Sequence, residues 1–230
     1  MTELLSSSTY AAVFVSLLFY CLGALLQKKL HSALCNPLLI SVAATVGFLL
    51  LFRLDYETYR ANSAILSYLL TPTTVCLAVP LYENLQALRQ NVKAILLGIF
   101  SGIAANLAVV ALLGLLFNLN HTQLVTLLPK SITTAIGMGV SEELGGVVSI
   151  TVAVIILSGI TANIAGESVL KLLRIREPIA KGLALGTSGH AIATARANEM
   201  GELEGAVSGL AIAVTGLLSA VLIPIFADLL

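Results

Sequence analysis

One lysine lies in the middle of an apolar segment and is surrounded by hydroxyl groups. Lys130 stands in the segment 122–146, directly after Pro129. The hydroxyl side chains beside it are those of Ser131, Thr133 and Thr134. A carboxylate is held well by a cationic donor together with hydroxyl or amide donors. This combination therefore predicts a binding site for a small organic anion.

The apolar surroundings of Lys130 have an energetic consequence. A lysine at the centre of a membrane costs about 2.5–3.5 kcal/mol on insertion scales, so its ammonium group should face a hydrated cavity or an acidic partner. Two simpler explanations stay open. Lys130 can extend to the membrane surface or pair with Glu142 or Glu143, and Ser and Thr side chains in membrane helices often bond to their own backbone.

A second polar group lies further along the chain, in the segment 182–204. It combines two hydroxyls, two glycines and an imidazole: Gly186, Thr187, Ser188, Gly189 and His190. We expect Thr187 and Ser188 to hydrogen-bond the same substrate as Lys130. Because histidine changes its charge near neutral pH, His190 is a candidate for taking a coupling proton, with a purely structural role as the alternative.

Acidic residues follow both polar groups. Glu142 stands near the end of the first segment, and Glu199 stands near the end of the second, three residues after Arg196. One expectation is that one of these carboxylates pairs with Lys130 or Arg196 across the two segments. The alternative is that the carboxylates face water. Glu142, Arg196 and Glu199 are therefore candidates for an ion pair or for coupling.

The sequence lacks the patterns of an enzyme or a metalloprotein. No nucleophile, base and orienting group can be assembled, and neither an HExxH zinc motif nor a Walker A phosphate loop occurs. Cys21, Cys35 and Cys76 form no CxxC pair and have no histidine at metal-ligand spacing. We therefore expect no catalytic residues, no metal and no cofactor.

The composition places these polar groups in a membrane protein. Of the 230 residues, 58% are hydrophobic and only 10% are charged, whereas soluble domains are about one quarter charged. A soluble core of this size cannot hide so much apolar surface. The net charge is zero, which argues against nucleic acid as a partner, because phosphate-binding surfaces need a basic excess.

Apolar runs predict the elements that position the polar groups. Five runs are long enough, or nearly so, to cross the bilayer as helices: 9–27, 37–52, 93–117, 147–170 and 205–228. Three further apolar stretches are interrupted by Gly, Pro, Ser and Thr: 63–82, 122–146 and 182–204. Irregular backbone at membrane depth survives only where protein or water satisfies it, so these three are candidates for broken helices or re-entrant hairpins.

Basic residues set the orientation, because cytoplasmic loops carry an excess of Lys and Arg. With the N-terminus outside and 63–82 crossing fully, 8 of the 10 loop cations lie inside if 122–146 dips in and returns to the outer side. Segment 182–204 would then be a hairpin that starts from the cytoplasm. The expected fold is an all-α polytopic integral membrane protein with about six full spans and two re-entrant or broken hairpins that meet near the midplane.

Smaller signals concern how the helices pack. Asn106 and Asn163 lie in the middle of their runs and are expected to make interhelical hydrogen bonds. Four glycines are expected to mark close helix contacts: Gly98, Gly102, Gly159 and Gly166. A short match between 69–74 and 127–131 leaves an inverted internal repeat as an open question, because such matches also arise by chance in apolar chains.

Four stretches of the sequence resemble the LrgB/CidB family of membrane proteins. They are NPLLI at 36–40, PTTVCLAVPLY at 72–82, PKSITTAIGMGVSEELGG at 129–146 and ALGTSGHAIATAR at 184–196. The resemblance covers nearly the whole chain and implies a single LrgB-like transmembrane domain over residues 1–230. Ala135 departs from the family pattern, which usually has proline there, and so does the order Ser188-Gly189 beside His190.

This resemblance implies two competing functions. Bacterial members are described as holin-like or antiholin-like proteins that modulate murein hydrolase export and autolysis together with a small LrgA/CidA-like membrane protein. Similar domains form part of the plastid glycolate/glycerate transporter, and some bacterial pairs are linked to pyruvate uptake. The residues around Lys130 favour transport of a small monocarboxylate such as pyruvate, glycolate or lactate. A location in the bacterial inner membrane and a homo-oligomer are also expected.

Overall fold

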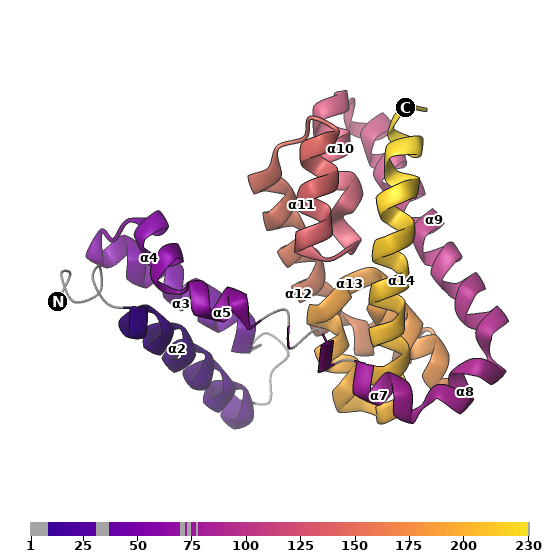
Figure 1. Cartoon of the computed structure of the whole chain (residues 1–230), viewed down its shortest axis with the longest axis horizontal. Coiled ribbons are helices and arrows are strands. Elements are labelled where there is room, and N and C mark those ends of the chain that lie inside the picture. Colours follow the sequence, from indigo (N-terminus) through magenta and orange to yellow (C-terminus); the bar gives the residue numbers. More distant parts are fainter. Residues whose placement is uncertain (1–8, 31–36, 70–71, 73–74, 77, 230) are drawn as a thin grey trace. The chain divides into compact units, whose positions relative to one another are not determined.

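The computed structural model describes residues 9–30, 37–69, 72, 75–76 and 78–229, and all regular elements in this part of the chain are helices (Figure 1). Contacts divide the chain into two compact units. We call them the N-terminal unit, Met1–Cys76, and the C-terminal unit, Leu77–Leu230. The predicted all-α class is confirmed in both.

Two apolar helices form most of the N-terminal unit. They are α2 (Thr9–Leu30) and α3 (Pro37–Phe52), and the short helices α4 (Tyr56–Asn62) and α5 (Ala64–Tyr68) follow them. The rings of Phe19 and Phe48 make an edge-to-face contact with centroids 5.8 Å apart, which joins α2 to α3. The hydroxyls of Ser16 and Tyr59 lie 2.6 Å apart and join α4 to α2. These helices confirm the predicted runs 9–27 and 37–52.

The predicted sixth span, 63–82, falls across the boundary between the two units. Its described parts include two short helices, α5 in the N-terminal unit and α7 (Ala78–Glu83) in the C-terminal unit. Residues 70–71, 73–74 and 77 lie outside the described residues. The full crossing of this segment stays a prediction.

Three long helices frame the C-terminal unit after α7 and α8 (Leu85–Gln90). They are α9 (Val92–Phe117), α12 (Val148–Leu172) and α14 (Glu202–Ala227). Together with α2, they are the helices of the described chain that are long and apolar enough to cross a membrane, and Leu39–Phe52 is a shorter apolar helix. At 1.5 Å per residue, each of the three is about 38 Å long, more than the hydrocarbon core requires.

Hairpin 1 is our name for residues 121–143, which connect α9 to α12. It consists of α10 (His121–Leu127), the 3-10 turn η2 (Leu128–Ser131) and α11 (Thr134–Glu143). Asn120 and Gln123 form a capping box that starts the first arm. Pro129 interrupts the helix, because proline has no N–H to donate, and its backbone leaves helical geometry at φ −82° and ψ 16°.

Contacts show that hairpin 1 reverses its direction at this break. Its first arm runs back along α9, and its second arm returns along α12 to the end from which it started. Four pairs of residues in contact record the reversal: Leu124 with Gly114, Leu128 with Asn106, Gly137 with Ile155 and Ser141 with Thr151. Hairpin 1 therefore penetrates about halfway along the long helices.

Hairpin 2 is our name for α13, Pro178–Met200, which connects α12 to α14. Its helix is broken at Gly189 and His190, whose φ and ψ angles are not helical. The first arm runs parallel to α14 and the second arm runs antiparallel to it. The pairs that record this are Gly182 with Val207, Gly186 with Ala211, Thr194 with Ser208 and Asn198 with Gly205. The predicted segment 182–204 thus contains a reversal, but Glu202 and Glu204 belong to the first turn of α14.

The two hairpins enter the C-terminal unit from opposite ends. In Figure 1, α10 and α11 lie in one half of this unit, α13 lies in the other, and α9 and α14 pass through both. Helix α9 meets hairpin 2 near its start and hairpin 1 near its end, because Gly98 packs against Leu183 and Gly114 packs against Leu124. Helix α12 runs the opposite way, since Thr151 bonds to Thr126 and Gly166 packs against Leu185.

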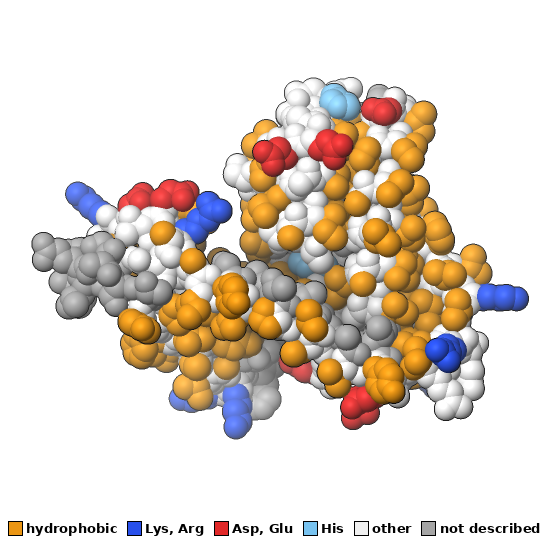
Figure 2. Space-filling model, viewed as in Figure 1, with side chains coloured by type: hydrophobic (Ala, Val, Ile, Leu, Met, Phe, Trp, Pro, Cys, Tyr) orange, Lys and Arg blue, Asp and Glu red, His pale blue; other side chains and the backbone are white. Residues whose placement is uncertain are grey.

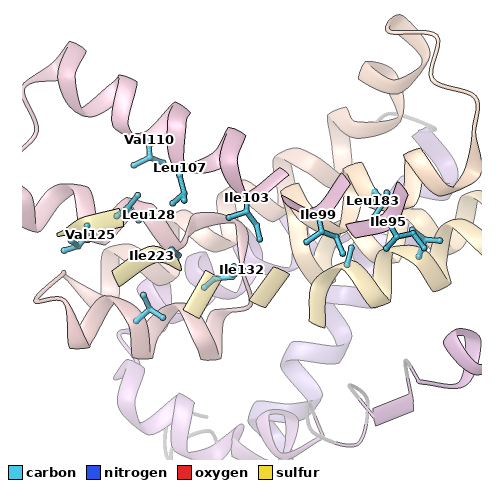
Figure 3. Packing of buried hydrophobic residues seen from close by; sticks show 14 of the residues in the cluster. Ile95, Ile99, Ile103, Leu107, Val110, Val125, Leu128, Ile132, Leu183 and Ile223 are labelled. Carbon is cyan, nitrogen blue, oxygen red and sulfur yellow. The ribbon is translucent and has the colours of Figure 1, made fainter. Parts of the chain in front are cut away.

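The main hydrophobic core follows one edge of α9. Five of its buried side chains recur every three or four residues: Ile95, Ile99, Ile103, Leu107 and Val110. Figure 3 shows them facing Leu183 of hairpin 2 at one end and Ile132, Leu128 and Val125 of hairpin 1 toward the other. This spacing places one stripe of the helix against both hairpins. The opposite side of α9 exposes large apolar residues such as Leu97 and Leu116, as expected of a surface that faces lipid.

Candidate functional site

The break of hairpin 1 carries a chain of polar contacts. The ammonium group of half-buried Lys130 donates to the Ser131 hydroxyl over 3.2 Å, and Ser131 donates to the amide oxygen of Asn106 over 3.1 Å. The Asn106 amide nitrogen donates to the carbonyl of Leu128 over 3.0 Å. Asn106 therefore satisfies a carbonyl next to the Pro129 break and also fixes the hydroxyl that accepts from Lys130.

At the break of hairpin 2, the side chain of His190 is buried against helix α12. His190 is only 3% exposed, and its ring Nε2 lies 3.0 Å from the carbonyl oxygen of Ile155 in α12. Its backbone φ of 42° is a strained value for a residue with a side chain. Gly159 makes room for the imidazole, because a Cβ there would lie 2.9 Å from the ring. The structure thus places His190 against α12.

The predicted hydroxyl ligands are in two different states. Thr187 and Ser188 donate to carbonyls one turn earlier in their own helix, Leu183 over 2.7 Å and Ala184 over 2.6 Å. This is the backbone bonding that the sequence left open as the alternative. By contrast, Ser131 bonds to another helix, and Thr133 and Thr134 are half-buried at the start of α11.

The two hairpin breaks lie close together along α9. Gly102 packs against Thr187 of hairpin 2, since a Cβ at Gly102 would lie 2.9 Å from the Thr187 hydroxyl oxygen. Asn106, which binds Ser131 of hairpin 1, is one turn further along the same face of α9. The structure therefore brings Lys130, Ser131 and Thr187 to neighbouring turns of one helix. Their part in binding a substrate stays a prediction.

The predicted ion-pair residues do not join the two hairpins. Arg196 pairs with Glu199 within the same helical arm and with Glu167 of α12. Glu167 also accepts from Lys171 over 2.6 Å. Glu142 is exposed on hairpin 1, at the other end of the unit from Arg196. The sequence missed Glu167 because its approach to Arg196 depends on how α12 packs against hairpin 2.

Charges are distributed unevenly between the ends of the C-terminal unit. Of its eight Lys and Arg residues, seven lie at the end where α9 and α14 start and α12 finishes: Arg89, Lys93, Lys171, Arg174, Arg176, Lys181 and Arg196. Several of them line a cavity of about 450 Å³ beside the end of α12. On the face seen in Figure 2, acidic side chains lie at both ends of this unit, and Glu167, Glu199 and Glu204 pair with several of these cations. Lys130 is the cation that lies apart from this basic end.

Two polar residues of the long helices, Asn163 and Thr215, were not among the predicted substrate-binding residues. Asn163 donates to the carbonyl of Ile192 over 2.7 Å, just after the break of hairpin 2. Thr215 of α14 is 3% exposed, and its hydroxyl is the buried side-chain atom without a hydrogen-bond partner among the described residues. Asn106 and Asn163 were expected to make interhelical bonds, and this is confirmed. No sequence signal marked Thr215.

Metal binding finds no support in the described part of the chain, where no group of three or more His, Cys, Asp or Glu side chains could hold an ion. The described structure is that of a polytopic helical membrane protein with a polar centre between two broken hairpins.

Comparison with known proteins identifies its family. The chain belongs to the LrgB-like family, whose model matches residues 16–229 and so spans both units. The holin-like protein CidB of Staphylococcus aureus (strain Mu50) is 37% identical over 213 residues, 93% of each chain. The antiholin-like protein LrgB of Bacillus mycoides is 36% identical over 220 residues, 94% of this chain and 95% of its own length. No solved structure matches this chain.

These relatives bear on the two expected functions. Their names describe holin-like and antiholin-like proteins, and they name neither a substrate nor an enzymatic activity. They agree with the alternative that the sequence left beside transport, and they confirm the resemblance to the LrgB/CidB family.

Proposed function

We propose that the C-terminal unit carries a small monocarboxylate, such as pyruvate, glycolate or lactate, across the membrane. The observation that supports this most is the position of Lys130. It is the cation of this unit that stands apart from the basic end, and it lies at the break of hairpin 1 beside Asn106 and Ser131. An ammonium group kept at that depth needs a function that offsets its insertion cost.

The partner of Lys130 is neutral, which leaves its charge for a ligand. Its ammonium group donates to a hydroxyl and forms no ion pair with any described residue. One cation with nearby hydroxyl and amide groups suits one carboxylate. The half-buried Thr133 and Thr134 extend this group of donors. In this proposal Thr187, Ser188 and His190 of hairpin 2 form the facing wall.

We further propose that the hairpins are re-entrant and that the basic end faces the cytoplasm. Hairpin 1 would then enter from outside and hairpin 2 from inside, with their breaks near the midplane. The bacterial inner membrane suits this orientation, and the bacterial relatives support it. An LrgA/CidA-like membrane partner and a homo-oligomer belong to the same proposal, because the family resemblance implies them.

A second candidate function is regulation of murein hydrolase export and lysis. The names of the relatives, holin-like CidB and antiholin-like LrgB, favour it. This function needs no selective pocket, so it gives no reason for a half-buried lysine bound to a serine at the centre of the unit. The two candidates therefore differ in what they predict for Lys130.

Uptake by proteoliposomes distinguishes the carrier from the lysis regulator. The full-length protein, with and without an LrgA/CidA-like partner, is reconstituted, and uptake of labelled pyruvate, glycolate and lactate is measured together with leakage of a trapped dye. We expect saturable uptake that falls about 10- to 100-fold in Lys130→Ala, the range implied by losing one charge-assisted hydrogen bond. Lys93→Ala, which removes a cation from the basic end, is the matched control and should retain uptake.

One result would contradict the carrier, and another would contradict the role of Lys130. Dye leakage without saturable uptake of any of the three acids would favour the lysis regulator. Equal uptake by wild type and Lys130→Ala would remove Lys130 from the site. Retention of native size in detergent shows that the variant is folded in either case.

A further inference from the structure

The C-terminal unit contains a repeated sequence at two equivalent places. Residues 101–108 of α9 read SGIAANLA, and residues 158–165 of α12 read SGITANIA, with six of eight positions identical. The two octapeptides lie 57 positions apart and each ends a half-turn after a mid-helix asparagine, Asn106 or Asn163. This match is longer than the one between 69–74 and 127–131.

The same interval relates the hairpins that follow. Adding 57 positions to hairpin 1, residues 121–143, gives residues 178–200, which are hairpin 2 with no insertion or deletion. Ser131 at the first break then corresponds to Ser188 at the second. A helix followed by a 23-residue hairpin therefore occurs twice, over 92–143 and 149–200.

The two copies have opposite directions. Helices α9 and α12 are antiparallel, because the start of α9 and the end of α12 both pack against the first arm of hairpin 2, through Gly98 and Gly166. Each hairpin turns back from the end at which its own long helix finishes. Two copies of opposite direction are the internal symmetry that many secondary transporters show.

Each asparagine makes the same kind of contact within its own copy. The amide of Asn106 donates to the Leu128 carbonyl at the break of hairpin 1, and the amide of Asn163 donates to the Ile192 carbonyl at the break of hairpin 2. The Leu128 carbonyl precedes the break of hairpin 1, whereas the Ile192 carbonyl follows the break of hairpin 2. The two asparagines therefore have the same role but bond to positions that are not equivalent. Both bonds satisfy backbone that the break leaves outside a regular helix.

We infer that residues 92–143 and 149–200 are inverted copies of one helix-and-hairpin unit, in which Asn106 and Asn163 are equivalent positioning residues that hold the two hairpin breaks. Loss of the Asn106 bond releases hairpin 1 and opens the centre toward the end where Glu142 lies. Loss of the Asn163 bond releases hairpin 2 and opens the centre toward the basic end. This inference rests on the proposed carrier function. It adds that the two asparagine bonds control access to the centre from the two sides of the membrane.

Cysteine accessibility tests the inference. Cys21, Cys35 and Cys76 are replaced by alanine, and a single cysteine is introduced as Ser188→Cys or, at the equivalent place, Ser131→Cys. A membrane-impermeant maleimide is added to vesicles of either orientation. We expect Asn106→Ala to raise labelling from the Glu142 end about 3- to 20-fold, the range expected for an interhelical bond in a membrane, and Asn163→Ala to raise it from the basic end.

Two kinds of control variant accompany this experiment, and two results would contradict the inference. Thr161→Ala removes a hydroxyl from α12 that bonds only within its helix, to Leu157, and should change neither side. Asn106→Ser and Asn163→Ser, which keep a short donor, serve where an alanine variant does not insert. Increased labelling from the same side in both variants, or from neither side, would overturn the inference.

Uptake by the asparagine variants, measured with Ser131 and Ser188 unchanged, separates this inference from the carrier. Opposite labelling patterns without uptake of any monocarboxylate would support the two inverted copies and contradict the carrier. Uptake with labelling that does not differ between the asparagine variants would support the carrier and contradict the positioning role.

Discussion

Hairpin 1 and hairpin 2 have the same length and the same reversal, yet their breaks are chemically different. At hairpin 1, Lys130 donates to Ser131, and Ser131 donates to Asn106 of the neighbouring helix α9. At hairpin 2, the hydroxyls of Thr187 and Ser188 bond to their own arm, and the ring of His190 bonds to α12. The break of hairpin 1 thus keeps a cationic donor whose partner is neutral, whereas the hydroxyls and the ring at the break of hairpin 2 bond to backbone carbonyls of the protein.

The difference teaches that equal composition does not give equal roles. Both breaks combine Ser and Thr with a titratable side chain, Lys130 or His190, and the sequence therefore assigned substrate contacts to both. In the structure His190 is almost fully buried, whereas Lys130 is half-buried. We expect substitutions in hairpin 2 to act on stability and substitutions in hairpin 1 to act on binding.

The largest effect on stability is expected for His190→Ala. The change removes a buried ring, leaves a cavity beside Gly159 and removes the bond between the ring and the Ile155 carbonyl, and it should destabilise the protein by about 3–5 kcal/mol. Thermal unfolding in detergent measures it, with exposed Ala191→Ser as the control. An unchanged melting temperature with a lost pH dependence of uptake would instead make His190 the proton-coupling group.

A matched pair of serines gives an intermediate effect on transport. Ser131→Ala removes the group between Lys130 and Asn106 and should raise the KM for the carried acid about tenfold, the value of one hydrogen bond to a charged group. Ser188→Ala, at the equivalent place of hairpin 2, removes only a bond to its own helix and should change the KM less than about twofold. Similar changes in both variants would contradict the difference between the hairpins.

The smallest effect is expected for Thr215→Val. This substitution keeps the shape of a buried side chain whose hydroxyl has no partner among the described residues, so the free energy of unfolding should stay the same or rise by about 1 kcal/mol. If the hydroxyl serves the site that the hairpins enclose, the KM rises a few-fold as well. A marked loss of stability would show that Thr215 has a structural partner, such as a buried water.

The sequence predicted the long elements well, because apolar length determines them. The run 147–170 became α12 at Val148–Leu172, and the run 93–117 became α9 at Val92–Phe117. Proline and glycine also indicated where the two hairpins break, since both residues disturb regular helix. The interhelical bonds of Asn106 and Asn163 followed from their place in the middle of apolar runs.

The sequence could not predict which polar groups find each other across the fold. Whether Ser188 faces a ligand or its own backbone depends on a rotamer. The pairing of Arg196 with Glu167 depends on how two helices cross, and it replaced the expected pairing between hairpins. The repeat at 101–108 and 158–165 was present in the sequence, but only the two antiparallel helices gave it meaning.

The regular spacing along α9 has a mechanical consequence. Ile95, Ile99 and Ile103 are four residues apart, and so are Gly98 and Gly102, which make room for hairpin 2. A slide of α9 by four residues, about 6 Å, would put each of these residues close to where its neighbour had been and would preserve most of the apolar fit. These apolar contacts therefore distinguish the two registers of this helix only weakly, and the bonds that Asn106 makes with Leu128 and Ser131 favour the observed one.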